Sequence, residues 1–124
     1  MVSAFLRPDG AAAQALRKAL HGFDVVASPQ SLDELNEVLA RDKFDRYLSR
    51  PQRLEYARTY AEAVRRVEVT RSVADCADPK DNKFLALALD ARAGMLVSGD
   101  KKDLLGMHPY QGIRILSIRQ FLAA

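Results

Sequence analysis

Short apolar runs alternate with helical patterns along the chain, and this alternation most constrains what the chain can fold into. The runs suited to buried strands are residues 23–27, 95–98 and 113–116, with a weakly specified one at 67–69. The patterns typical of helices cover residues 11–21, 28–39, 51–65 and 84–92, with shorter ones at 101–105 and 117–121. Strands separated by helices are typical of βαβ units. We therefore predict an α/β fold with three layers (α/β/α) and a mostly parallel central sheet.

Serine residues mark the starts of two predicted helices. Ser28 followed by Pro29 is typical of an N-cap and a first helical turn, and Ser117 can cap the closing helix. The apolar residues after Ser28 fall on one stripe, formed by Leu32, Leu35, Val38 and Leu39. The acidic residues of the same helix, Asp33, Glu34 and Glu37, therefore lie off the buried stripe.

The composition indicates a soluble protein with one domain, residues 1–124. Hydrophobic residues make up 48% and charged residues 28%, which excludes a disordered or fibrous chain. The net charge of +3 would help to hold a polyanion but does not identify one. The single cysteine, Cys76, excludes an internal disulfide and suits a reducing cytoplasm. We see no signal peptide and no apolar run long enough to cross a bilayer, so we expect a cytoplasmic protein without a membrane partner.

Acidic residues stand where a parallel sheet places its ligands, beyond the carboxyl ends of the strands. Asp100 directly follows the predicted strand 95–98, and Asp81 opens the helix that leads into that strand. Glu34 lies in the first two turns of the helix after the strand that ends near Ala27. We expect these three carboxylates to meet at one end of the sheet.

Carboxylates that gather in one place repel one another unless a cation neutralises them. Mg²⁺ and Mn²⁺ prefer oxygen ligands, and such a site can activate a water for attack on a phosphodiester. Each residue also has a simpler interpretation. Asp81 could be a helix cap, for which Asp78 competes, Glu34 could be a solvated helix residue, and Asp100 could belong to a plain turn.

Four sequence blocks, taken in order, resemble the PIN-domain family, most closely the VapC-related toxin components of toxin–antitoxin systems. The blocks are Ser28-Pro29 with residues 32–39, then residues 78–88, 96–100 and 112–116. The resemblance covers nearly the whole chain. It implies a metal-dependent endoribonuclease that cuts RNA, is restrained by a cognate antitoxin protein, and forms a homodimer.

The resemblance also assigns roles to residues. Glu34, Asp81 and Asp100 match the acidic positions of the family's site, so they would be the catalytic residues and the ligands of Mg²⁺ or Mn²⁺. Asp103 would be an auxiliary carboxylate, and Ser98 matches a small hydroxyl residue that would position a ligand or a water. The RNA target, its cleavage sequence and the antitoxin family do not follow from the residues.

The start of the chain departs from the family pattern. Family members begin with a hydrophobic strand that ends in Asp-Thr-Asn, whereas residues 1–6 resemble the segment just after it. We therefore expect the first strand and its aspartate to be missing, through a start codon assigned at an internal methionine rather than through decay of the gene. This chain should then bind metal weakly and cleave RNA poorly. The alternative is a non-catalytic, degenerate PIN module that binds RNA or an antitoxin, and a phospho-acceptor receiver domain fits less well.

Other residues carry weaker expectations. Lys101 and Lys102 could contact RNA phosphates as point charges, or could be plain surface residues. Cys76 is expected to be a small buried hydrophobe rather than a nucleophile. We expect four aromatic residues to pack between the middle helices: Phe44, Tyr47, Tyr56 and Tyr60. We expect three arginines to form a solvated basic face: Arg65, Arg66 and Arg71.

Overall fold

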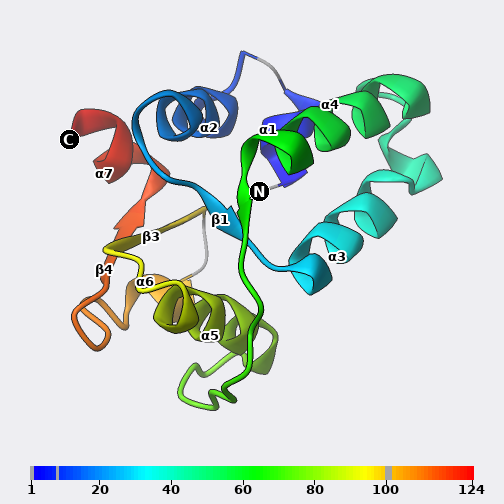
Figure 1. Cartoon of the computed structure of the whole chain (residues 1–124). Coiled ribbons are helices and arrows are strands. Elements are labelled where there is room, and N and C mark those ends of the chain that lie inside the picture. Colours follow the sequence, from blue (N-terminus) through cyan, green and yellow to red (C-terminus); the bar gives the residue numbers. More distant parts are fainter. Residues whose placement is uncertain (1, 8, 100–101) are drawn as a thin grey trace. The chain divides into compact units, whose positions relative to one another are not determined.

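The computed structural model describes residues 2–7, 9–99 and 102–124 (Figure 1). The chain forms two compact units, of which the first ends at Arg66 and the second begins at Val67. The elements of the first unit are α1 (Val2–Leu6), α2 (Ala11–Gly22), β1 (Val26–Ala27), α3 (Pro29–Leu39), η1 (Asp42–Phe44), α4 (Arg50–Ala63) and β2 (Arg65–Arg66). Those of the second unit are η2 (Pro79–Asp81), α5 (Asn82–Asp90), β3 (Met95–Ser98), α6 (Lys102–Leu105), β4 (Arg114–Ser117) and α7 (Ile118–Ala123).

Each unit contains one pair of parallel strands joined through helices. In the first unit β1 pairs with β2, so that Val26 lies opposite Arg65. In the second unit β3 pairs with β4 over four residues, from Met95 opposite Arg114 to Ser98 opposite Ser117. Short parallel strands that alternate with helices confirm the predicted α/β class. The three-layer arrangement and the missing first strand stay predictions.

Two strand predictions need correction. The strand expected at residues 23–27 is only β1, and the strand expected at residues 67–69 is wrong because those residues are neither helix nor strand. The second strand instead begins directly after α4, where the Arg65 amide donates to the Val25 carbonyl at 2.9 Å. Backbone pairing does not need apolar side chains, and Arg65 and Arg66 both stay exposed. The apolar pattern therefore predicted the start of this strand two residues too late in the sequence.

The same local motif starts three helices. In α3 the Ser31 amide donates to the Ser28 hydroxyl and the Ser28 amide to the Ser31 hydroxyl, each at 3.0 Å. Ser49 forms the equivalent capping box at the start of α4, and Ser117 at the start of α7. The caps predicted at Ser28 and Ser117 are confirmed, whereas the cap at Ser49 was not predicted.

Each unit has its own cluster of buried apolar side chains. In the first unit the cluster comprises Phe5, Ala27, Leu32, Leu35, Leu39, Ala57, Tyr60 and Val64. In the second unit it comprises Cys76, Leu85, Ala88, Leu104, Tyr110, Ile113 and Ile115. Cys76 is buried as predicted, and so is Tyr60. The packing role expected of Tyr47 and Tyr56 is wrong, because the two residues are 37% and 43% exposed.

Arg53 is fully buried at the point where α3 leads into α4. Its Nε donates to the Leu39 carbonyl at 2.7 Å, and its other nitrogens donate to the carbonyls of Leu48 and Arg41 and to Asp45 Oδ1. The last carbonyls of a helix have no partner within the helix, so a guanidinium with five donors is well suited to bind them. Arg53 therefore fixes the connection between the two helices.

Candidate metal centre

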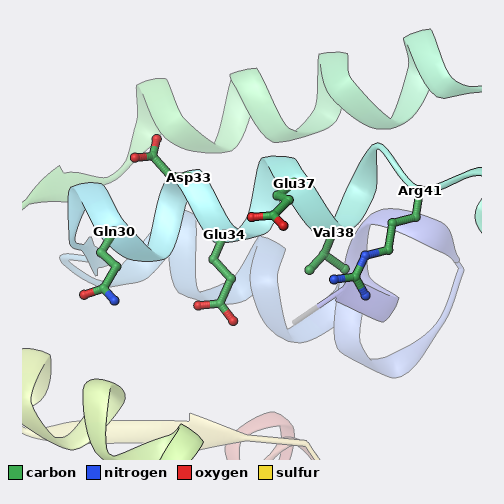
Figure 2. A pocket seen from close by; sticks show the side chains of 6 residues that line it. All are labelled: Gln30, Asp33, Glu34, Glu37, Val38 and Arg41. Atoms are coloured by element: carbon green, nitrogen blue, oxygen red, sulfur yellow. The ribbon is translucent and has the colours of Figure 1, made fainter.

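Helix α3 presents Glu34 to solvent. Leu32, Leu35 and Leu39 are buried away from Glu34, which confirms three residues of the predicted apolar stripe, whereas the fourth, Val38, is only partly buried. An open surface depression of about 670 Å³ lies beside this helix, lined by Gln30, Asp33, Glu34, Glu37, Val38 and Arg41. Figure 2 shows Gln30 and Glu34 extending from the same side of α3, with Asp33 on the other side and Arg41 in the segment that follows the helix. The carboxylates on this surface are therefore accompanied by a guanidinium.

The loop in front of α5 contains Asp78, Asp81 and Asn82, whose side chains have different partners. Asp78 caps the short helix η2, since its Oδ1 accepts from the Lys80 amide at 3.1 Å. Asn82 Oδ1 accepts from the Cys76 amide at 2.8 Å and so holds the start of the loop against the start of α5. The Asp81 side chain makes no capping hydrogen bond. Asp78 therefore serves as the cap, and the interpretation of Asp81 as a plain helix cap is wrong.

Asp81 is buried, with 2% of its surface exposed. Its Oδ2 atom is a buried oxygen without a hydrogen-bond partner among the residues that the structure describes. A buried polar atom that lacks a partner is costly, and a buried carboxylate oxygen is especially so. Such an atom calls for a positive or hydrogen-bonding ligand. The chemistry of Asp81 is therefore compatible with a cation ligand.

Three other predicted site residues of the second unit lie at the end of β3 and in α6. Ser98 is the last residue of β3 and is 7% exposed. Lys102 and Asp103 lie in the first turn of α6 and are exposed to solvent. The remaining two, Asp100 and Lys101, lie outside the described residues. The structure therefore positions Ser98, Lys102 and Asp103, without testing the roles predicted for them.

The convergence of Glu34, Asp81 and Asp100 stays a prediction. Glu34 belongs to the first unit and Asp81 to the second, and each is described within its own unit. Among residues 2–7, 9–99 and 102–124, no three side chains of His, Cys, Asp or Glu form a group that could hold a metal ion. The predicted trio includes Asp100, which is not among those residues.

Two polar contacts of the second unit were missed by sequence reasoning. Tyr110 donates its hydroxyl to Asp75 Oδ2 at 2.5 Å, and Arg71 Nε donates to Asp90 Oδ1 at 2.6 Å. Arg71 was expected on a solvated face; it is exposed, yet it is paired with Asp90. The contacts attach residues 67–75, which are neither helix nor strand, to α5 through Asp90 and to the segment between α6 and β4 through Tyr110. The partners are far apart in sequence, so no local pattern indicates them.

Comparison with known proteins decides the family. A family model described as PIN domain matches residues 1–102. The chain belongs to the PIN-domain family. The matched range of this PIN domain contains Glu34, Asp81 and Asp100, whereas Asp103 lies just beyond it. No curated protein and no solved structure matches the chain.

Membership of the PIN family supports a nuclease-type function, because PIN domains are commonly nucleases that use divalent metals. The buried Oδ2 of Asp81, which has no hydrogen-bond partner in the part of the chain that the structure describes, agrees with the donor chemistry that such a metal requires. In the described part of this PIN domain we find no helix with the length and apolar character needed to cross a membrane.

Proposed function

We propose that this PIN domain is a metal-dependent endoribonuclease that hydrolyses RNA phosphodiester bonds as the toxin of a toxin–antitoxin system. Its partners would be the RNA substrate, a cognate antitoxin protein and a second copy of the chain. The observation that carries the proposal is Asp81, a carboxylate within the range matched by the PIN family that is 2% exposed and has one oxygen without a hydrogen-bond partner among the described residues. Burial of such a group is costly for folding, so a functional reason for it is favoured.

The donor set fits Mg²⁺ or Mn²⁺. Glu34, Asp81 and Asp100 offer only carboxylate oxygens, which these hard cations prefer over nitrogen and sulfur. We assign the three carboxylates as the metal ligands, with Asp103 as an auxiliary carboxylate. When bound, the cation would supply an activated water and would stabilise negative charge on the leaving oxygen.

The remaining site residues would orient the RNA. The Ser98 hydroxyl, at the end of β3, can hold a water or a phosphate oxygen by a hydrogen bond. Lys102 is exposed in the first turn of α6, where its ammonium group can contact a backbone phosphate as a point charge, and Lys101 would act with it. None of these contacts reads the base sequence.

The substitution Asp81→Asn tests the proposal against a matched control, Asp78→Asn. Both variants remove one carboxylate from the same loop, but the amide introduced by the control keeps an oxygen that can accept from the Lys80 amide. We expect Asp81→Asn to slow Mn²⁺-dependent cleavage of RNA by at least about 100-fold, because loss of a direct ligand should exceed the 10–100-fold effect of an outer-shell partner. The control should cleave like the parent protein.

The alternative function, a non-catalytic module that binds RNA or an antitoxin, makes a different prediction. It requires RNA or antitoxin binding without cleavage at any Mg²⁺ or Mn²⁺ concentration. Cleavage that persists in a chelator, or that Asp81→Asn and Asp78→Asn reduce equally, would count against the metal centre.

A further inference from the structure

Two arginines gather around one exposed tyrosine in the first unit, and neither arginine belongs to the proposed metal centre. The guanidinium carbon of Arg46 lies 4.9 Å from the centroid of the Tyr47 ring, and that of Arg7 lies 5.6 Å from it. Arg46 also donates from Nη2 to the Tyr47 hydroxyl at 2.9 Å. Residues from the end of α1 and from the turn after η1 are thus brought together by one aromatic ring.

Positive charge dominates this surface. Arg7, Arg46 and Tyr47 are all exposed, and none of the carboxylates in the described residues forms an ion pair with either arginine. The adjacent segment 41–50 adds three further basic side chains, Arg41, Lys43 and Arg50. Of its two aspartates, Asp45 is paired with the buried Arg53. The segment therefore carries an excess of basic groups over free carboxylates.

The arrangement is suited to a phosphate group. The hydrogen bond from Arg46, with a further contribution from Arg7, lowers the pKa of the Tyr47 hydroxyl, so both cations act on the same small region. A guanidinium has five N–H donors in a planar fork that matches phosphate, and the hydroxyl of Tyr47 takes one of them from Arg46. An aromatic ring beside arginines is also the combination that proteins use to hold single-stranded nucleic acid.

We propose that Arg7, Arg46 and Tyr47, called here the arginine–tyrosine clamp, bind the phosphate backbone of single-stranded RNA. The clamp is a second RNA contact, separate from the carboxylates and from Lys101 and Lys102. The choice of RNA over another polyanion rests on the proposed nuclease function. The clamp would hold the strand by its backbone and would not select a base sequence.

The test measures binding of a fluorescently labelled single-stranded RNA by anisotropy, in a metal chelator and over a range of salt concentrations. Arg7→Ala with Arg46→Ala should weaken binding at least about tenfold and should lower the salt dependence, the slope of log K against log salt, by about 1.4. Arg114→Ala with Arg119→Ala is the charge-matched control, since both arginines are exposed in the second unit. The control should retain the parent slope to within about 0.5.

Two further variants separate the contact from folding. Arg7→Lys with Arg46→Lys keeps the charge but loses the planar fork, and should bind RNA between the parent and the double alanine variant. Tyr47→Leu removes the ring that holds both guanidinium groups, and should weaken binding while Tyr47→Phe, which keeps the ring, stays within about threefold of the parent. Thermal unfolding of each variant shows whether it is folded.

Several results would overturn the clamp. The first is that the parent protein does not bind RNA. The second is that the two double alanine variants lose RNA affinity equally. The third is that a polyglutamate peptide competes for the protein as well as unlabelled RNA does. The last result would assign the surface to an acidic protein instead. Because binding is measured without metal, a protein that binds RNA through the clamp but never cleaves it contradicts only the nuclease proposal. Normal cleavage with binding unchanged in Arg7→Ala/Arg46→Ala contradicts only the clamp.

Discussion

Arg53 donates its Nε to the carbonyl of Leu39, the last residue of α3, at 2.7 Å. The acceptor belongs to one helix and the donor to the next, so this hydrogen bond replaces a partner that the end of α3 lacks. The same side chain reaches Asp45, which is 58% exposed and can stay hydrated on its own. The buried carbonyls, rather than the ion pair, therefore determine what Arg53 contributes to stability.

Replacing Arg53 with Met should destabilise the protein by about 2–4 kcal/mol. Met fills much of the volume, but it leaves the Leu39 carbonyl and its neighbours without a donor. Urea denaturation measures the effect. Arg58→Ala is the control: Arg58 forms an exposed pair with Glu55, so its loss should leave the free energy of unfolding nearly unchanged. Equal effects of the two substitutions would show that Arg53 is not a structural residue.

The contact that holds residues 70–71 against Asp90 of α5 should weaken in acid. The Thr70 amide, followed by the Arg71 side chain, holds the pKa of the Asp90 carboxyl below its ordinary value of 3.8. A carboxyl whose pKa is lower in the folded state stabilises the protein above the unfolded pKa, and this contribution disappears as the pH falls through the folded pKa. Stability should therefore decline below about pH 4.

Asp90→Asn should lower stability at neutral pH, because Asn cannot form an ion pair with the Arg71 guanidinium. The same substitution should make stability fall less steeply as the pH drops below about 4, because the titrating carboxyl is gone. Hydrogen exchange of the Thr70 amide reports the contact directly, since this amide donates to Asp90 Oδ2 at 2.7 Å. Asp90→Ala removes the acceptor altogether, so an unchanged exchange rate in Asp90→Ala would show that the contact does not protect this segment.

The pKa of the Tyr110 hydroxyl should lie above that of an ordinary tyrosine. Its hydrogen bond to Asp75, followed by burial, raises the pKa of Tyr110 above 10.0. This contribution to stability is present below the unfolded pKa and is lost as the pH rises through the folded pKa. Asp75→Asn should lower the pKa of Tyr110, as measured by ultraviolet titration of the phenolate. Tyr110→Phe should cost about 1 kcal/mol of stability, and a pKa unchanged by Asp75→Asn would contradict the contact.

The sequence predicted those parts of the structure that depend on neighbouring residues. The cap at Ser28 depends on Ser31, three positions later, and the cap at Ser117 depends on Gln120. The limits of β3 follow from a short apolar run that ends at Gly99, and the structure confirms them as Met95–Ser98. Such signals are complete within a few residues, so they can be found before any tertiary contact is known.

The sequence did not predict contacts between distant residues. Arg53 is a charged residue within α4, yet the carbonyls it binds lie up to 14 residues away and become neighbours only after α3 and α4 have packed. Similarly, Tyr110 and Asp75 are separated by 35 positions. In the candidate site, the position of Asp81 at a helix start was predictable, but its burial was not. Its neighbours Asp78 and Asn82 accept from backbone amides of the loop, the Lys80 amide and the Cys76 amide respectively.

The effect of Mn²⁺ on unfolding tests the proposed metal centre most directly. If Asp81 is a ligand, the parent protein and Asp78→Asn should each gain about 2.7 kcal/mol when Mn²⁺ is present at about 100 times its Kd, and Asp81→Asn should gain far less. Without metal, Asp81→Asn should be the more stable protein by on the order of 1 kcal/mol, because a neutral amide is less costly to bury than a carboxylate. If Mn²⁺ stabilises Asp81→Asn as much as the parent protein, or stabilises neither, the assignment of Asp81 as a metal ligand is contradicted.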